Sequence, residues 1–138
     1  MKIDRFESIK AWQEARILVK MIYDAVKSNK KLGSGYKFWE QIQSAAVSIM
    51  SNIAEGFSRR STKEFTQFLF IAKGSAAEVQ SQLYIALDQG YISHQKFSEI
   101  YSKSDEVARM LSGFIQYLLK LNKPNKLNEP NKLSGKER

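Results

Sequence analysis

Apolar residues recur at three- and four-residue steps in four segments of this chain, which is the spacing of one buried face on an α-helix. The spacing predicts helices over residues 8–27, 36–57, 61–90 and 93–121. The links at 58–61 and 90–93 are too short for anything but a reversal of direction. The sequence therefore predicts an all-α, antiparallel up-down-up-down four-helix bundle.

The second predicted helix has the widest apolar arc. It centres on Ile49 and extends through Trp39 and Met50 to Val47 and Ala54. This arc exceeds what a helix facing one core requires, so we expect part of it to bury against another subunit. We expect the first helix to bury Trp12, Ala15, Val19, Ile22 and Val26. We expect the fourth helix to bury Ile100, Tyr101, Val107, Met110 or Leu111, Phe114, Ile115, Leu118 and Leu121.

Residues that favour helix ends stand at the borders of these segments. Ser61 and Glu64 have the spacing of a capping box, in which the serine hydroxyl accepts from the amide three residues on. Gly90 is suited to cap the end of the third helix, and Ser93 is suited to cap the start of the fourth. These borders support the reversals expected between the helices.

Length and composition predict the number of domains, a flexible tail and the cellular compartment. A chain of 138 residues with a 43% hydrophobic share is long enough for one core, and we expect one domain over residues 1–121. Residues 122–138 repeat Asn, Lys and Pro and predict a flexible tail, either merely solvated or in contact with RNA. There is no cysteine, no signal-like N-terminus and no apolar run near the length of a membrane span, so we expect a cytoplasmic protein.

Positive charge gathers at the predicted ends of the bundle. The net charge is +8, and residues 120–138 supply half of it, with six basic and two acidic side chains. Arg59, Arg60 and Lys63 cluster at the link between the second and third helices, and Lys30 and Lys31 lie in the preceding link. These side chains are either simply solvated or contact the phosphates of RNA or DNA.

Polar residues interrupt the apolar faces of the second and third helices. Asn52, Glu55, Ser75 and Glu78 stand at helical spacing, and Glu55 precedes Arg59 by the four residues that favour an ion pair. In a hairpin that turns near residue 60, paired positions sum to about 120, so Asn52 and Glu78 belong to different layers. We interpret the four as structural polar contacts that fix the register, in preference to a catalytic carboxylate pair.

The sequence offers little for catalysis. Its one histidine, His94, begins a predicted helix without a carboxylate nearby in the sequence. No metal-ligand spacing, nucleophile elbow or phosphate-binding glycine loop occurs. We therefore expect no catalytic residues, no metal and no cofactor.

Several short motifs, in order, resemble those of the 23S rRNA intervening sequence protein family. They are Phe6-Glu7-Ser8-Ile9-Lys10-Ala11-Trp12-Gln13-Glu14-Ala15, Asn52-Ile53-Ala54-Glu55-Gly56, Lys63-Glu64-Phe65, Phe68-Leu69 and Gly74-Ser75-Ala76-Ala77-Glu78. The resemblance covers about residues 6–120. It implies a four-helix bundle, a homopentamer with basic surfaces and no enzymatic activity. The chain is also similar to the accessory protein of diversity-generating retroelements, which binds nucleic acid and partners a reverse transcriptase.

Two hypotheses follow. The first is a non-catalytic homo-oligomer that binds RNA or DNA through phosphate contacts, made by Arg59, Arg60, Lys63, Lys30 and Lys31. The second is an assembly scaffold that recruits a protein partner such as a reverse transcriptase, with basic ends that serve only solubility. Neither hypothesis involves a membrane.

Overall fold

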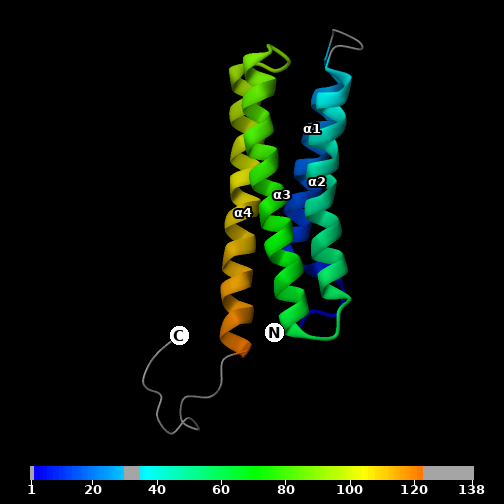
Figure 1. Ribbon diagram of the computed structural model, residues 1–138, viewed down its shortest axis with the longest axis vertical. Coiled ribbons are helices and arrows are strands. Elements are labelled where there is room, and N and C mark those ends of the chain that lie inside the picture. Colours follow the sequence, from blue (N-terminus) through cyan, green and yellow to red (C-terminus); the bar gives the residue numbers. More distant parts are fainter. Residues whose placement is uncertain (1, 30–34, 123–138) are drawn as a thin grey trace, which may run out of the picture.

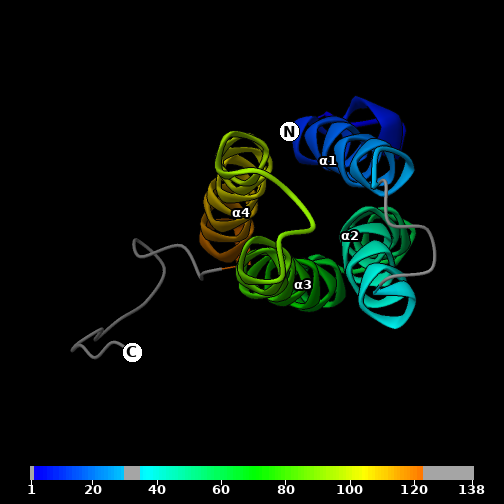
Figure 2. The ribbon, with the colours of Figure 1, turned by 90° about the horizontal axis from the view of Figure 1, so that it is seen from above.

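The computed structural model describes residues 2–29 and 35–122, and within them it contains four α-helices and one short 3-10 helix. These elements are η1 (Phe6–Ser8), α1 (Lys10–Lys27), α2 (Tyr36–Phe57), α3 (Thr62–Asp88) and α4 (His94–Asn122). Each helix runs antiparallel to the one before it (Figure 1), and the four surround a common core (Figure 2). The predicted antiparallel four-helix bundle is confirmed.

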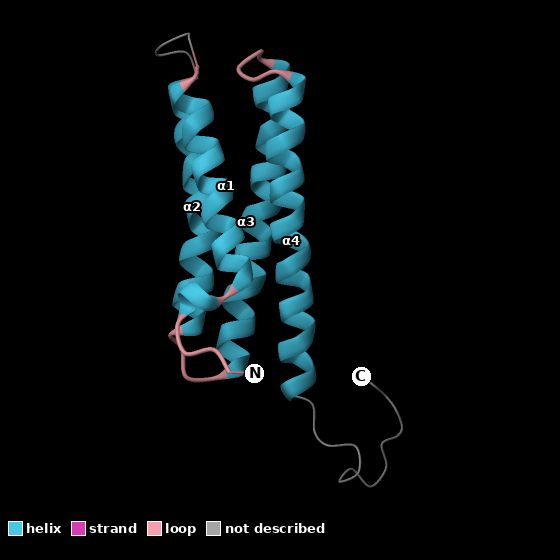
Figure 3. Cartoon of the chain, turned by 180° about the vertical axis from the view of Figure 1, so that it is seen from behind, coloured by secondary structure: helices cyan, strands magenta, loops and turns pink. Residues whose placement is uncertain are grey.

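The helices pack in a ring. α2 lies against α3, α3 lies against α4, and α1 closes the ring by contacting both α2 and α4. One end of the bundle holds the N-terminal segment, the α2–α3 turn and the last turn of α4 (Figure 3), and we call it the α2–α3 end. The predicted tail, from residue 123 onward, lies outside the described residues. No helix in the described part is long and apolar enough to cross a membrane.

α1 begins at Lys10, two residues later than predicted, because residues 6–8 form η1 instead. Its buried face is built largely from small residues, Ala11, Ala15 and Ala25, together with Leu18 and Ile22. Simple hydrophobicity gives alanine little weight, and the predicted face was therefore rotated from the observed one. Of the predicted positions Ala15 and Ile22 are buried, while Trp12, Val19 and Val26 are only partly buried.

The wide apolar arc of α2 is used inside the chain. Trp39, Ala46, Ile49 and Ile53 are buried because α2 packs against α1 on one side and α3 on the other. Val47, at the edge of the arc, is 37% exposed. The width of the arc is therefore explained by two neighbours in the same chain and is no evidence for a subunit contact.

α4 buries most of its predicted face, including Leu111, Ile115 and Leu118. The prediction for Leu121 was wrong, because this side chain is 55% exposed. The hydroxyl of Ser104 donates to the carbonyl of Ala76, at 3.2 Å, so positions facing each other on α3 and α4 sum to about 180. Leu121 then lies level with the α2–α3 turn, beyond the first residue of α3, where no helix covers it.

The helix ends have the predicted caps. The Ser61 hydroxyl accepts from the amide of Glu64 at 3.1 Å, and the Ser93 hydroxyl accepts from the amide of Lys96 at 3.1 Å. Gly90 has a φ of +74°, and its amide and that of Tyr91 bond to the last free carbonyls of α3. This pairing is a Schellman motif, which needs a left-handed residue at the position of Gly90.

Candidate nucleic-acid interface

The cationic side chains at the α2–α3 turn differ in whether a neighbouring side chain compensates their charge. Arg59 donates to the carboxylate of Glu55 at 2.8 Å, and its guanidinium lies 4.9 Å from the centre of the Phe68 ring. Both contacts restrain Arg59 and compensate its charge. Arg60 and Lys63 are exposed and form no ion pair with any described residue. They are the better placed of the three to contact an anion.

Two more cations lie at the same end. Lys2 in the N-terminal segment and Lys120 in the last turn of α4 are exposed, and no described residue forms an ion pair with either. Arg5 is held by Glu7 at 3.2 Å. The α2–α3 end therefore presents four uncompensated positive charges from three separate parts of the chain.

The opposite end of the bundle holds the end of α1 and the start of α2. The predicted contact residues Lys30 and Lys31 lie outside the described residues. Lys27 at the end of α1 and Lys37 at the start of α2 flank them, and both are exposed without an ion pair in the described part. This end thus has two uncompensated cations among its described residues, against four at the α2–α3 end.

Most of the net charge of +8 belongs to residues outside the described part of the chain. The described residues hold 15 of the 22 basic and 12 of the 14 acidic side chains, a balance of +3. Seven of these 15 basic residues take part in ion pairs. A bundle this close to neutral attracts a polyanion only where its unpaired cations gather.

The polar residues between α2 and α3 form a connected chain. The Asn52 amide donates to the carbonyl and the hydroxyl of Ser48, at 2.8 and 3.0 Å, and the Ser48 and Ser75 hydroxyls lie 3.0 Å apart. Ser48 and Ser75 sum to 123, so the hairpin register is shifted by about one turn from the predicted one. The sequence had not indicated Ser48, which joins the predicted Asn52 to Ser75. Of the four residues predicted to fix the register, only Ser75 makes a polar contact between α2 and α3. Asn52, Glu55 and Glu78 bond to residues of their own helix or the turn that follows it.

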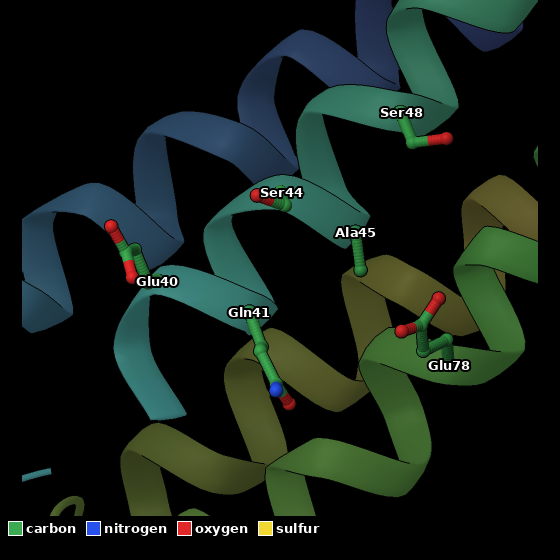
Figure 4. Close-up of a pocket in the computed structure, with 6 residues that line it drawn as sticks. All are labelled: Glu40, Gln41, Ser44, Ala45, Ser48 and Glu78. Atoms are coloured by element: carbon green, nitrogen blue, oxygen red, sulfur yellow. The ribbon is translucent and has the colours of Figure 1, made fainter. Parts of the chain in front are cut away.

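Glu78 lines an open groove of about 560 Å³ between α2 and α3, with Glu40, Gln41, Ser44, Ala45 and Ser48. Glu40 and Glu78 stand on separate sides of the groove, and their carboxyl groups do not converge (Figure 4). Glu78 accepts from Gln82 at 3.3 Å. The described residues contain no group of three or more His, Cys, Asp or Glu side chains that could hold a metal. The groove has polar walls but no arrangement for acid–base chemistry.

A partly buried ion pair joins α1 to α4, and sequence reasoning missed it. Lys103 donates to Glu14 at 2.6 Å and also pairs with Glu106 at 2.9 Å, while Lys10 lies 3.6 Å from Glu14. The hydrogen bond from Lys103 lowers the pKa of the Glu14 carboxyl, and the hydrogen bonds to Glu14 and Glu106 raise the pKa of the Lys103 ammonium. The available signal was the place of Glu14 in the sequence, three residues after buried Ala11 and four before buried Leu18.

The family profile of the 23S rRNA-intervening sequence protein matches residues 7–113, which is most of the chain. The chain belongs to this family. The matched range includes η1 from its second residue, all of α1, α2 and α3, and α4 as far as Gly113. No curated protein matches the sequence.

The fold of this 23S rRNA-intervening sequence family member is similar to a solved structure. That structure is a protein of unknown function from the S23 ribosomal protein family of Bacteroides thetaiotaomicron, with 25% sequence identity and a TM-score of 0.64. The similarity covers 78% of this chain and 95% of the other. The Asn52-to-Gly56 motif has structural roles here: Asn52 joins the polar chain, Glu55 restrains Arg59, and Gly56 lets α2 approach Phe68.

Proposed function

We propose that this protein is a non-catalytic, cytoplasmic homo-oligomer that binds RNA or DNA through phosphate contacts at the α2–α3 end. The observation that carries the proposal is the gathering of unpaired cations at that end: Lys2, Arg60, Lys63 and Lys120. Residues 123–138 follow α4 in the sequence and add five basic and two acidic side chains. The resemblance of the sequence to its family implies five subunits, and a ring would repeat this cationic end once per subunit.

Phosphate contact without base reading suits these side chains. Lysine and arginine on flexible stems neutralise phosphates and release counterions, which gives affinity without sequence preference. Arg59 contributes less than predicted, because Glu55 already compensates its charge. Arg60 and Lys63 are therefore the residues on which binding depends most.

The test is a pair of matched double variants. Arg60→Ala/Lys63→Ala removes two unpaired cations from the α2–α3 end, and Lys27→Ala/Lys37→Ala removes two from the opposite end. We expect the first pair to weaken binding of RNA and DNA of any sequence and to flatten the dependence of log K on log salt by roughly 1.5–2. The second pair should leave the slope close to that of the wild type.

Two results in a filter-binding assay would contradict the proposal. One is no measurable affinity of the wild-type protein at low salt for either RNA or DNA. The other is an equal loss in both double variants, which would mean that net charge alone matters and that no particular end binds.

The near-neutral bundle favours a second candidate function. With a balance of only +3 in the described residues, the bundle also suits a scaffold that recruits a protein such as a reverse transcriptase. A pull-down from the host with and without nuclease separates the two functions. A partner retained after nuclease treatment supports the scaffold, and a partner lost with the nucleic acid supports the leading proposal.

A further inference from the structure

The sequence around the end of α4 and beyond it has a period of three residues. From Leu121 to Leu133 every third residue is leucine or proline, in the order Leu, Pro, Leu, Pro, Leu. Asparagine and then a charged residue follow each of the first four, giving the triplets Leu-Asn-Lys, Pro-Asn-Lys, Leu-Asn-Glu and Pro-Asn-Lys. Three residues per turn is the period of a polyproline II helix, which would place all the leucines and prolines on one side. We call residues 121–133 the C-terminal repeat. It lies beyond residue 113, where the match to the family ends.

A hollow beside α4 has the composition to receive the apolar side of such a segment. It has a volume of about 310 Å³, lies between α4 and the N-terminal segment, and is lined chiefly by Ile3, Ile9, Met110, Gly113 and Phe114. A Cβ atom placed at Gly113 would meet nothing within 4 Å among the described residues, so the floor of the hollow is open. Grooves lined by aromatic and apolar side chains are the sites at which proline-containing segments dock.

The hollow continues along α4 away from the α2–α3 end. A second hollow, of about 370 Å³, shares Met110 with the first and is otherwise lined by Ser102, Asp105, Glu106 and Arg109. The α4 residues that line the two hollows recur at three- and four-residue steps, so they form one strip along the helix. We call this strip, from Ser102 to Phe114, the α4 groove. Its half nearer the α2–α3 end is apolar, and its other half carries two carboxylates and one guanidinium.

We propose that the C-terminal repeat folds back and docks in the α4 groove of its own chain, with Leu127 in the hollow at Gly113. The length of chain after α4 supports this occupant. Phe114 lies eight residues before Asn122, which is about 12 Å along the helix. Leu127 is five residues after Asn122 and can reach about 17 Å, whereas Pro124 can reach only about 7 Å. Leu127 is therefore the first apolar side chain of the repeat after α4 that can enter the hollow.

The spacing of the leucines matches the length of the groove. Leu127 and Leu133 are six residues apart, which is about 19 Å in a polyproline II helix. Phe114 and Ser102 are twelve residues apart on α4, which is about 18 Å. With Leu127 level with Phe114, Leu133 thus lies level with Ser102, and both leucines occupy the groove at once.

Charge favours the same direction of docking. Lys132 directly precedes Leu133, so it lies at the end of the groove that holds Asp105 and Glu106. The side chains of these two acidic residues are 40% and 44% exposed, and each pairs with one cation of α4. A carboxylate accepts from more than one donor, so both can also receive a lysine ammonium. Residues 123–138 have five basic and two acidic side chains, which suits this end of the groove.

Docking would control how much positive charge the protein offers to a polyanion. In the docked arrangement the lysines of the repeat lie along α4 and not at the α2–α3 end. Release of the repeat should therefore tighten the binding of RNA and DNA at low salt by roughly threefold or more. This consequence rests on the proposed function, whereas the docking itself does not.

The test measures the distance between two spin labels in the full-length protein by pulsed electron paramagnetic resonance. The chain has no cysteine, so Ser98→Cys/Ser134→Cys attaches labels at only two positions. Ser98 is exposed on α4, one turn beyond Ser102, and Ser134 follows Leu133. Docking should give distances of about 20 Å. Without docking, about 36 Å of helix and a twelve-residue coil of about 19 Å combine to about 40 Å. Dilution with unlabelled protein leaves one labelled chain in each oligomer.

Two matched pairs of variants in the labelled protein test which residues hold the repeat. Leu127→Asn/Leu133→Asn should move the distances to about 40 Å, while Asn125→Ser/Asn131→Ser, on another side of the repeat, should leave them short.

A second pair changes the bundle. Gly113→Gln puts a long polar side chain in the hollow and should also lengthen the distances, while Gly74→Gln makes the same change on α3 outside the groove. Gly113→Ala adds a single methyl group, for which the hollow has room beside a leucine. Circular dichroism should show the wild-type helix content in every variant, because glutamine favours helix more than glycine does.

Four results would overturn the proposal. They are distances near 40 Å without further substitution, short distances that persist in Leu127→Asn/Leu133→Asn or in Gly113→Gln, equal lengthening in a variant and its matched control, and a short distance that disappears on dilution. The last would mean that the repeat docks on a neighbouring subunit. Nucleic-acid affinity is measured separately with Arg60→Ala/Lys63→Ala. Failure of that assay together with a short distance would remove the proposed binding and leave the docking supported.

Discussion

The ion pair between Glu14 and Lys103 allows a quantitative test of how α1 is held against α4. In Lys103→Met the ammonium is lost while a long apolar side chain remains. Glu14, whose side chain is only 11% exposed, then keeps Lys10 at 3.6 Å as its remaining cationic partner. The variant thus leaves the Glu14 carboxylate with little exposure to water and with only the longer ion pair to Lys10.

The exposed fractions of the paired side chains determine how much stability the variant is expected to lose. Removing one partner of a fully buried pair costs about 3–5 kcal/mol. The Lys103 side chain is 21% exposed and Lys10 still compensates Glu14, so we expect a loss of about 2 kcal/mol in the free energy of unfolding. For a chain of this length that loss lowers the melting temperature by roughly 6 °C. Glu14→Gln should cost less, about 1 kcal/mol, because Lys103 keeps Glu106 and the amide still accepts a hydrogen bond.

The pH dependence follows from the directions of the two pKa shifts. The folded protein lowers the pKa of Glu14, so this carboxylate stabilises the fold above its ordinary pKa of about 4.3 and ceases to do so as the pH falls through the folded value. The folded protein raises the pKa of Lys103. Stabilisation by its ammonium is therefore complete below a pH of about 10.4 and is lost as the pH rises through the folded pKa. The deficit of Lys103→Met is therefore greatest from about pH 5 to pH 10.

Urea unfolding across this pH range measures the deficit, with Lys20→Met as the control. Lys20 pairs with Asp24 at 3.2 Å, but both side chains are more than half exposed, so its loss should be within about 0.5 kcal/mol. The reasoning would be refuted if Lys103→Met were no less stable than Lys20→Met at pH 7. A deficit that stayed unchanged at pH 3 would refute it equally.

Two further changes test the α2–α3 hairpin by thermal unfolding. Gly56→Ala should destabilise the protein by about 2 kcal/mol, because its Cβ would stand 2.6 Å from that of Phe68. Gly113→Ala, which meets nothing within 4 Å, should stabilise it by ~0.5–1 kcal/mol, and the same sign in both variants would be inconsistent with the close approach. Ser61→Ala should cost about 1 kcal/mol by leaving the amide of Glu64 uncapped, whereas Ser61→Asp should cost little.

The helices were predictable because their signals are local. Periodicity placed α2 at its observed bounds, and the predicted caps Ser61, Gly90 and Ser93 end or begin helices as expected. Local signals could not show which side of α1 is buried, because alanines fill much of that side and the choice depends on two neighbouring helices. The exposure of Leu121 likewise depends on where α3 begins, which the sequence of α4 does not contain.

The candidate site was less predictable than the fold. The sequence placed Arg59 and Arg60 at one turn, but it could not rank them, because the ranking depends on the contacts of Arg59 with Glu55 and Phe68. The polar chain from Asn52 to Ser75 needed a hairpin register accurate to one turn.

The closure of the ring by α1 and α4 has a consequence for how the chain folds. The α2–α3 and α3–α4 hairpins join segments that are adjacent in sequence, and such contacts form quickly. Glu14 and Lys103, by contrast, are 89 residues apart, so their pairing requires the closure of a long loop. On a ribosome, α1 is complete long before its partner on α4 has been synthesised, and its acidic residue stays in water until then. The last helix to be made is the one that lets the first one bury its charge.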